Sequence, residues 1–249
     1  MVQEHGQEAR QRVAIVTGAG RGVGRAVAIA LARAGFALCI AARTHEELEE
    51  TRALSGLTPA RSLIVLIDLV QEGAPECLIG AAFEHFGQVD VLVNNAGWAP
   101  ARTPLVKVSE GDQDRMLAVN LRAPITLTRL AAKRMAAQER GGAIVNIASN
   151  AARRMAVGEA IYAAAKAGLI AFTHAAFAEL RERRIKLSVI VPGLINTSLI
   201  PQNKRLDRAL MLRPEDVAAD VMMVVNASAG VCPVEVVLEP QRDPIRGVR

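Results

Sequence analysis

The hydrophobic positions of this chain fall into short continuous runs that alternate with longer segments of mixed character. The runs are apolar at nearly every position, which is typical of strands buried on both faces of a sheet. The longer segments repeat apolar residues every three or four positions, as amphipathic helices do. We predict strands at 13–17, 36–42, 62–68, 89–95, 142–149, 186–192 and 234–239. We predict helices at 23–34, 45–54, 72–86, 111–138, 158–182 and 214–227.

This alternation predicts an α/β fold, a single doubly wound domain of the Rossmann type with a parallel seven-stranded sheet and helices on both faces. The chain contains neither a Pro/Gly/Ser-rich linker nor an internal repeat, so residues 1–249 are expected to form one domain. Residues 1–11 are polar and are expected to be a disordered tail. Residues 194–211 mix apolar and polar positions and are expected to form a lid. Ligands of such folds bind beyond the carboxyl ends of the strands.

A glycine-rich turn follows the first strand and opens the first helix. Its sequence, "TGAGRGVGRA" (17–26), places backbone that can approach a phosphate next to a helix N-terminus. The common G-x-G-x-x-G fingerprint is not matched, whereas T-G-x-x-x-G-x-G fits, with Thr17, Gly18, Gly22 and Gly24. A ligand-free loop is the structural alternative, but the strand–turn–helix context favours nucleotide binding.

The end of the second strand indicates which nucleotide is bound. An acidic residue there would hold the ribose 2′-hydroxyl of NAD, and an arginine would accommodate the 2′-phosphate of NADP. Ala42 stands where the acid would be, Arg43 follows it, and Arg21 adds a second cation from the glycine turn. We therefore expect NADP(H) to be preferred, with NAD(H) as the lesser alternative. Both arginines could also be ordinary surface charges.

The chain's single tyrosine, Tyr162, stands four residues before Lys166, so the two share one face of a helix. A nearby ammonium favours the phenolate and is expected to lower the tyrosine pKa. The pair could then exchange a proton with a carbonyl or alcohol oxygen while a nicotinamide exchanges hydride. Ser149, at the end of the fifth strand, and Asn120, within the long helix, add polar groups, although caps and turns also use such residues.

Together these motifs resemble the short-chain dehydrogenase/reductase family over nearly the whole chain. The resemblance implies that Tyr162 is the general acid/base, that Lys166 lowers its pKa and binds the nicotinamide ribose, and that Ser149 orients the substrate. It also implies that Asn120 supports a proton relay, that Asp68 binds the adenine and that Asn94 holds the adenosine side. The implied cofactor-binding residues are Thr17, Gly18, Gly20, Arg21, Gly22, Val23, Gly24, Arg43, Asp68, Leu69, Asn95, Ala96, Gly97, Tyr162, Lys166, Pro192, Gly193, Ile195 and Thr197.

Two departures from the family pattern bear on the substrate. The usual V-D-G-G end is replaced by "VVLEPQ" (236–241), and the loop after Pro192–Gly193 is short. Both features resemble NADP-dependent enzymes acting on 3-hydroxy acids and related small alcohols or ketones. A 3-oxoacyl thioester (acyl-carrier) reductase is the alternative. Trp98 and Arg153 are candidate substrate residues, Arg153 or Arg154 as a partner for a carboxylate or phosphate, and packing or surface roles are the alternatives.

Composition narrows the partners and the compartment. The net charge is +5, but the basic residues are scattered and only 3% of the residues are aromatic, so nucleic acid is not expected as a partner. The three dispersed cysteines show no metal-ligand or disulfide spacing and favour a cytoplasmic protein without a metal site. No membrane span is expected. His174 is expected on a buried helix face. The resemblance implies a homo-oligomer, a tetramer or dimer; a non-catalytic NADP-binding regulator on the same fold is a further alternative.

Overall fold

The computed structural model describes residues 10–198, 200 and 203–245. The expected tail thus lies outside the described residues apart from Arg10 and Gln11, and part of the expected lid does as well. These two residues contact the rest of the domain. Arg10 pairs with Asp90 at 3.1 Å, and the Gln11 amide donates a hydrogen bond to the Gly35 carbonyl.

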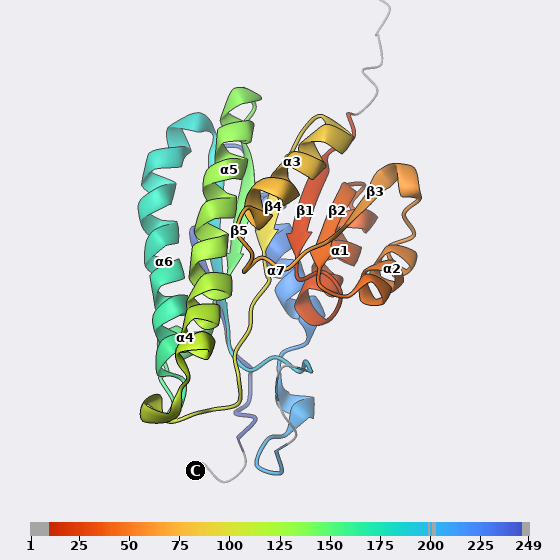
Figure 1. The fold of residues 1–249 in the computed structure, drawn as a ribbon. Helices are drawn as coiled ribbons and strands as arrows, with labels where there is room; N and C mark the ends of the chain where they lie inside the picture. Colours follow the sequence, from red (N-terminus) through yellow and green to blue (C-terminus); the bar gives the residue numbers. More distant parts are fainter. Residues whose placement is uncertain (1–9, 199, 201–202, 246–249) are drawn as a thin grey trace, which may run out of the picture.

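The strands form one parallel sheet in the order β3-β2-β1-β4-β5-β6-β7 (Figure 1), which confirms the predicted fold. The strands are β1 (Val13–Thr17), β2 (Ala37–Ala42), β3 (Ser62–Leu66), β4 (Val91–Asn94), β5 (Gly142–Ile147), β6 (Ile185–Pro192) and β7 (Glu235–Leu238). The strand order reverses between β1 and β4, because β2 and β3 lie on one side of β1 and the later strands on the other. The crevice beyond their carboxyl ends is where such folds bind ligands.

The helices lie close to the predicted segments. They are α1 (Gly22–Arg33), α2 (His45–Leu54), α3 (Ala74–Phe86), α4 (Glu110–Leu117), α5 (Ala123–Ala137), α6 (Ala160–Leu180) and α7 (Pro214–Asn226). Short 3₁₀ helices occupy Pro59–Arg61, Leu105–Lys107, Asn150–Ala152, Arg181–Arg183 and Arg208–Leu210. The single helix predicted at 111–138 is wrong in one respect, because a π-helical segment, Ala118–Arg122, separates α4 from α5.

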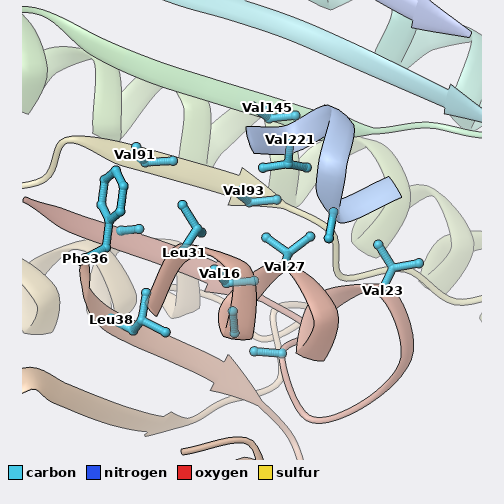
Figure 2. Packing of buried hydrophobic residues seen from close by; sticks show 14 of the residues in the cluster. Val16, Val23, Val27, Leu31, Phe36, Leu38, Val91, Val93, Val145 and Val221 are labelled. Carbon is cyan, nitrogen blue, oxygen red and sulfur yellow. The ribbon is translucent and has the colours of Figure 1, made fainter. Parts of the chain in front are cut away.

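Two apolar clusters cover the two faces of the sheet, because successive strand residues point to opposite faces. On one face Val16, Val93 and Val145 pack against α1 and α7 (Figure 2). On the other face Ile15, Leu92 and Ile144 pack against α3 and α5. The strands therefore need apolar residues at almost every position, which is the pattern seen in the sequence.

Helix α6 differs from its prediction in how it is buried. The stretch Ala160–Arg183 is long and apolar enough to span a membrane by length and composition, with a mean hydropathy of 1.3 in its most apolar window. In this fold it packs on β6 and beside α4 and α5, and it buries Lys166. The expectation that His174 lies on the buried face is wrong, because its side chain is 47% exposed and bonds Glu235 of β7.

Candidate active site

The glycine turn is held against the neighbouring strand end by a compact hydrogen-bond network. The Thr17 hydroxyl accepts hydrogen bonds from the backbone N–H groups of Asn95 and Ala96, both at 3.0 Å. The Asn95 amide donates to the carbonyls of Thr17 and Gly18 at 2.9 and 3.2 Å. Thr17 and Asn95 therefore shape the site by joining the ends of β1 and β4. A methyl group on Gly24 would lie 2.1 Å from the Gly18 carbonyl oxygen, so only glycine fits there.

The same turn leaves a helix N-terminus free for an anion. Gly18 and Gly22 adopt φ angles of 64° and 54°, which favour glycine. In the described chain, no side chain caps the first turn of α1, so its N–H groups and the helix dipole are available to a phosphate. A methyl group on Gly22 would face the Thr197 side chain at 3.4 Å. The turn and the segment after β6 are thus neighbours, and the free N–H groups at the start of α1 fit a phosphate of a dinucleotide.

The two predicted arginines, Arg43 after β2 and Arg21 in the glycine turn, share this edge of the site with a carboxylate from α2. Arg43 is exposed, and Ala42 leaves room beside the glycine turn. Glu47 of α2 points back at this turn: its carboxylate lies 3.6 Å from the Arg21 guanidinium, and a methyl group on Gly20 would meet it at 2.9 Å. Arg21 is therefore shared between Glu47 and any phosphate bound at this edge.

Asp68 lies two residues beyond β3 at the adenine end of the expected site. Its carboxylate is 3.6 Å from the Arg115 guanidinium of α4. That guanidinium also lies 5.1 Å from the centre of the Trp98 ring. Asp68 and Arg115 line a cavity of about 320 Å³. Trp98 thus makes a cation–π contact with the same arginine that pairs with Asp68.

Ser149, Tyr162 and Lys166 meet beyond the ends of β5 and β6. The Ser149 hydroxyl lies close enough to the Tyr162 phenol to lower its pKa. The Lys166 ammonium lies 5.8 Å from the centre of the Tyr162 ring and donates to the Ile147 carbonyl at 2.9 Å. Lys166 is only 3% exposed, and a methyl group on Gly97 would come within 3.7 Å of its nitrogen. The remaining N–H groups of the ammonium suit ribose hydroxyls.

The phenol of Tyr162 does not have the lowered pKa that the sequence suggested. Burial raises the pKa of Tyr162, the hydrogen bond from Ser149 lowers it, and the charge of Glu159 raises it. Glu159 precedes α6 and is paired with Arg102 at 2.6 Å. The Lys166 ammonium points to a backbone carbonyl, so burial of the phenol outweighs it. In this structure Ser149 is therefore the group that favours the phenolate.

Asn120 explains why an amide stands in the middle of a helical stretch. Its side chain is fully buried in the π-helical segment, donates to the Trp98 and Met116 carbonyls at 2.6 and 3.0 Å, and accepts from the Trp98 N–H at 3.3 Å. A methyl group on Gly97 would lie 3.0 Å from its oxygen. Asn120 thus fixes the backbone of Gly97 and Trp98 beside Lys166, as π-segments at functional sites often do.

Two assignments from the sequence do not fit. The Asn94 side chain is 2% exposed and donates to Asn146 and Thr128 at 2.8 and 3.2 Å, so it belongs to the core and does not face an adenosine. The Arg153 guanidinium forms an ion pair with Glu235 of β7 and is not free for a substrate anion. The sequence around Asn94 and Arg153 does not show which distant residues their side chains contact.

Lys166 gives the stability of the protein a distinct pH dependence. Burial lowers the pKa of Lys166 from 10.5 to about 8, so between these values the unfolded chain binds more protons than the folded one. Without added cofactor, the free energy of unfolding should therefore rise with pH across this window, by on the order of 3 kcal/mol from this group. The Lys166→Met variant should lack that rise. Urea unfolding of both proteins at several pH values measures the difference, and parallel curves would contradict it.

Comparison with known proteins identifies the family. Residues 12–207 match the family model described as short chain dehydrogenase. The chain belongs to this family. It is 35% identical to D-erythrulose reductase from Gallus gallus over 76% of this chain and 74% of that protein.

Two solved structures of family members are similar throughout. A metagenomic short-chain oxidoreductase in complex with NADP has a TM-score of 0.80 and 30% identity, covering 93% of this chain and 98% of that one. The 3-ketoacyl-(acyl-carrier-protein) reductase from Brucella melitensis, complexed with NADH, has a TM-score of 0.84 and 27% identity, covering 93% and 98%. The chain is therefore a short-chain oxidoreductase that acts on alcohol or ketone groups of small molecules with a nicotinamide cofactor.

Proposed function

We propose that this protein is an NADP(H)-dependent carbonyl reductase or alcohol dehydrogenase in which Tyr162 exchanges the proton. The observation that carries this proposal is the convergence of Ser149, Tyr162, Lys166 and Asn120 beyond the strand ends, with Lys166 and Asn120 on either side of Gly97. The bound nicotinamide supplies or accepts the hydride. The chain's own residues bind and orient the reactants and move the proton.

Each side chain has a distinct task in this scheme. The single O–H of Ser149 stabilises the phenolate of Tyr162 before the substrate binds, and it donates to the substrate oxygen and orients it once the substrate is in place. In the reducing direction the Tyr162 phenol gives its proton to the carbonyl oxygen; in the oxidising direction its phenolate takes the proton from the alcohol. Lys166 binds the nicotinamide ribose through its buried ammonium. Asn120 holds the Gly97–Trp98 backbone that borders Lys166 and supports a proton relay to it.

In this proposal the other predicted residues would hold the rest of the cofactor. The N-terminus of α1, with the turn from Gly18 to Gly24, would bind the phosphates. Asp68 and Leu69 would hold the adenine, and Asn95, Ala96 and Gly97 would line the adenosine side. Pro192, Gly193, Ile195 and Thr197 would hold the nicotinamide, and the contact between Thr197 and Gly22 supports a place for this segment beside the glycine turn. Arg21 and Arg43 would bind the 2′-phosphate.

Arg43→Ala should erode the preference for NADPH over NADH. Arg43 is exposed at the end of β2 and carries the charge that the 2′-phosphate requires, while Ala42 supplies no acid for a 2′-hydroxyl. Losing one charge-assisted contact should lower the ratio of kcat/KM for the two cofactors by about 10-fold. Arg33→Ala, at the far end of α1, is the matched control. A wild-type protein that prefers NADH would overturn the cofactor proposal.

The substrate we propose is a small ketone or secondary alcohol of the 3-oxo or 3-hydroxy type. Arg153 and Arg154 are paired with Glu235 and Glu239, so the uncharged members of this class fit the site better than a 3-oxo acid. The likeness to D-erythrulose reductase favours a hydroxyketone. A panel of ketoses, 3-oxo acids, acyl thioesters and bulky ketones, followed by NADPH absorbance, tests this choice.

A 3-oxoacyl thioester reductase is the second candidate, because the acyl-carrier reductase structure covers nearly the whole chain. Turnover of acyl thioesters and not of free ketones would favour it. A non-catalytic regulator would bind NADPH but turn over no member of the panel.

We further propose a cytoplasmic homo-oligomer, a tetramer or dimer. The outward face of α6 supports this, because Ala164, Ala171 and Ala175 are exposed on an apolar helix and small residues let helices approach closely. Sedimentation velocity measures the state, and a monomer at micromolar concentration would contradict it.

A further inference from the structure

The turn that follows Ser149 is fastened to the last strand of the sheet by charged side chains. The Asn150 amide donates to the Glu239 carboxylate at 3.4 Å, and the Arg154 guanidinium lies 3.7 Å from the same oxygen. Arg153 forms the ion pair with Glu235. We call these five residues, Asn150, Arg153, Arg154, Glu235 and Glu239, the β7 clamp. It joins the catalytic turn to a strand that lies more than eighty residues later in the sequence.

Ser149 moves with this turn because hydrogen bonds make the segment 149–154 one unit. The Ser149 hydroxyl accepts from the Ala151 N–H at 3.2 Å, and the Ser149 carbonyl accepts from the Ala152 N–H at 3.1 Å. The N–H groups of Arg153 and Arg154 donate to the Asn150 carbonyl at 2.8 and 2.7 Å. A displacement of Asn150 or Arg154 is therefore expected to displace the Ser149 hydroxyl as well.

Glu239 also contacts the turn after β6. A methyl group on Gly193 would lie 2.6 Å from the second carboxylate oxygen of Glu239, and the Gly193 N–H donates to the Leu238 carbonyl at 2.8 Å. Glu239 therefore lies between the turn that carries Ser149 and the Pro192–Gly193 turn. In the family pattern this part of the chain reads V-D-G-G, whereas here it reads "VVLEPQ" (236–241) and places Glu239 beside Gly193.

We propose that Glu239 is a positioning residue that, through Asn150 and Arg154, holds Ser149 against Tyr162. The last strand then controls how strongly Ser149 stabilises the phenolate in the proton-transfer step. This inference rests on the proposed function, because it concerns the proton-transfer step, but one of its tests, the ionisation of Tyr162, needs no turnover. Charged groups that face Tyr162 are Lys166 on its own helix and Glu159, which is paired with Arg102.

The two halves of the clamp differ in what else they contact. Glu235 also lies 2.8 Å from the His174 ring, so a substitution of Glu235 would disturb two partners on different elements. The charged and amide partners described for Glu239 are Arg154 and Asn150, both in the turn that follows Ser149. Glu239 is therefore the better position for a test.

Glu239→Ala should lower kcat for alcohol oxidation by only about 5-fold, because exposed ion pairs are individually weak. The rising limb of kcat against pH should move to higher pH by about half a unit, since a loosened Ser149 no longer lowers the pKa of Tyr162 to the same degree. Glu239→Gln keeps the side-chain length and an oxygen for Asn150, so it should recover part of both effects.

The control is Glu76→Ala, which breaks a similar ion pair to Arg129, also at 3.7 Å, between α3 and α5. It should leave the pH profile unchanged. Because Tyr162 is the only tyrosine of the chain, the near-ultraviolet absorbance of tyrosinate reports its ionisation without any substrate. In this titration the pKa of Tyr162 should be higher in Glu239→Ala than in the wild type, by the same amount as the shift in the kcat profile.

A Glu239→Ala protein with the wild-type pH profile and tyrosinate titration would overturn the proposal. An equal shift in Glu76→Ala would also overturn it. If the wild type fails to turn over any alcohol or ketone, the proposed function is wrong, and the tyrosinate titration still decides the clamp.

Discussion

Tyr162→Phe should bind NADPH with wild-type affinity and lose about 10³-fold in kcat. The substitution removes the phenolic hydroxyl beside Ser149, which is the proton donor and acceptor in the proposed mechanism. The ring is retained, so its packing and its 5.8 Å contact with the Lys166 ammonium remain. Fluorescence titration of NADPH and steady-state turnover of the best substrate measure the two quantities.

Ser149→Ala is the companion variant, because it removes the hydroxyl that lies beside this phenol. It should impair the same step less severely and shift the apparent pKa of Tyr162 upward. Turnover of Tyr162→Phe at the wild-type rate would exclude the proposed mechanism. Loss of NADPH binding in that variant would show that the main role of the hydroxyl is to bind the cofactor and not to transfer the proton.

Gly24→Ala should destabilise the fold by about 3 kcal/mol and abolish tight NADPH binding. The added methyl group would lie 2.1 Å from the Gly18 carbonyl oxygen and 2.5 Å from the Asn95 amide nitrogen. Neither neighbour can yield cheaply, because one is backbone and the other holds the turn through two hydrogen bonds. The first turn of α1 would have to move away from the position where it meets the phosphates.

Gly80→Ala is the matched control for this prediction. Gly80 lies within α3, and no described atom comes within 4 Å of the added methyl group. Replacing a glycine inside a helix with alanine should stabilise the protein by about 0.5–1 kcal/mol. Urea unfolding of both variants measures the contrast. A Gly24→Ala protein as stable as the wild type would show that the turn has more freedom than its contacts indicate.

The long helix shows why a correct periodicity still missed a structural feature. The spacing of apolar residues over 111–138 is that of one helix, and the structure interrupts it at Ala118–Arg122. The sequence does contain one sign of this interruption, the amide of Asn120 in the middle of an apolar helical stretch. A buried amide needs hydrogen-bond partners, and in the structure these are the carbonyls of Trp98 and Met116. The sequence raised the question, but only the position of the Trp98 backbone answers it.

Side-chain partners from distant segments account for the remaining differences. The carboxylate of Glu47 reaches Arg21, and Glu235 reaches Arg153, across tertiary contacts that no local pattern encodes. Burial rather than a neighbouring charge sets the direction of the Tyr162 pKa. These effects depend on which atoms exclude water and which charges lie within a few ångströms in space.

By itself the sequence determined the doubly wound sheet, the glycine turn and the set of polar residues at the strand ends. The repeat of apolar residues identifies each helix and strand from its own segment of the chain. Parallel strands bring their carboxyl ends to one edge of the sheet, so the polar residues that follow them are expected to lie close together. The tertiary structure alone decided that Asn94 belongs to the core, that Arg153 is neutralised and that Ser149 favours the phenolate. Those outcomes depend on distances between segments far apart in the chain, which only the packed fold fixes.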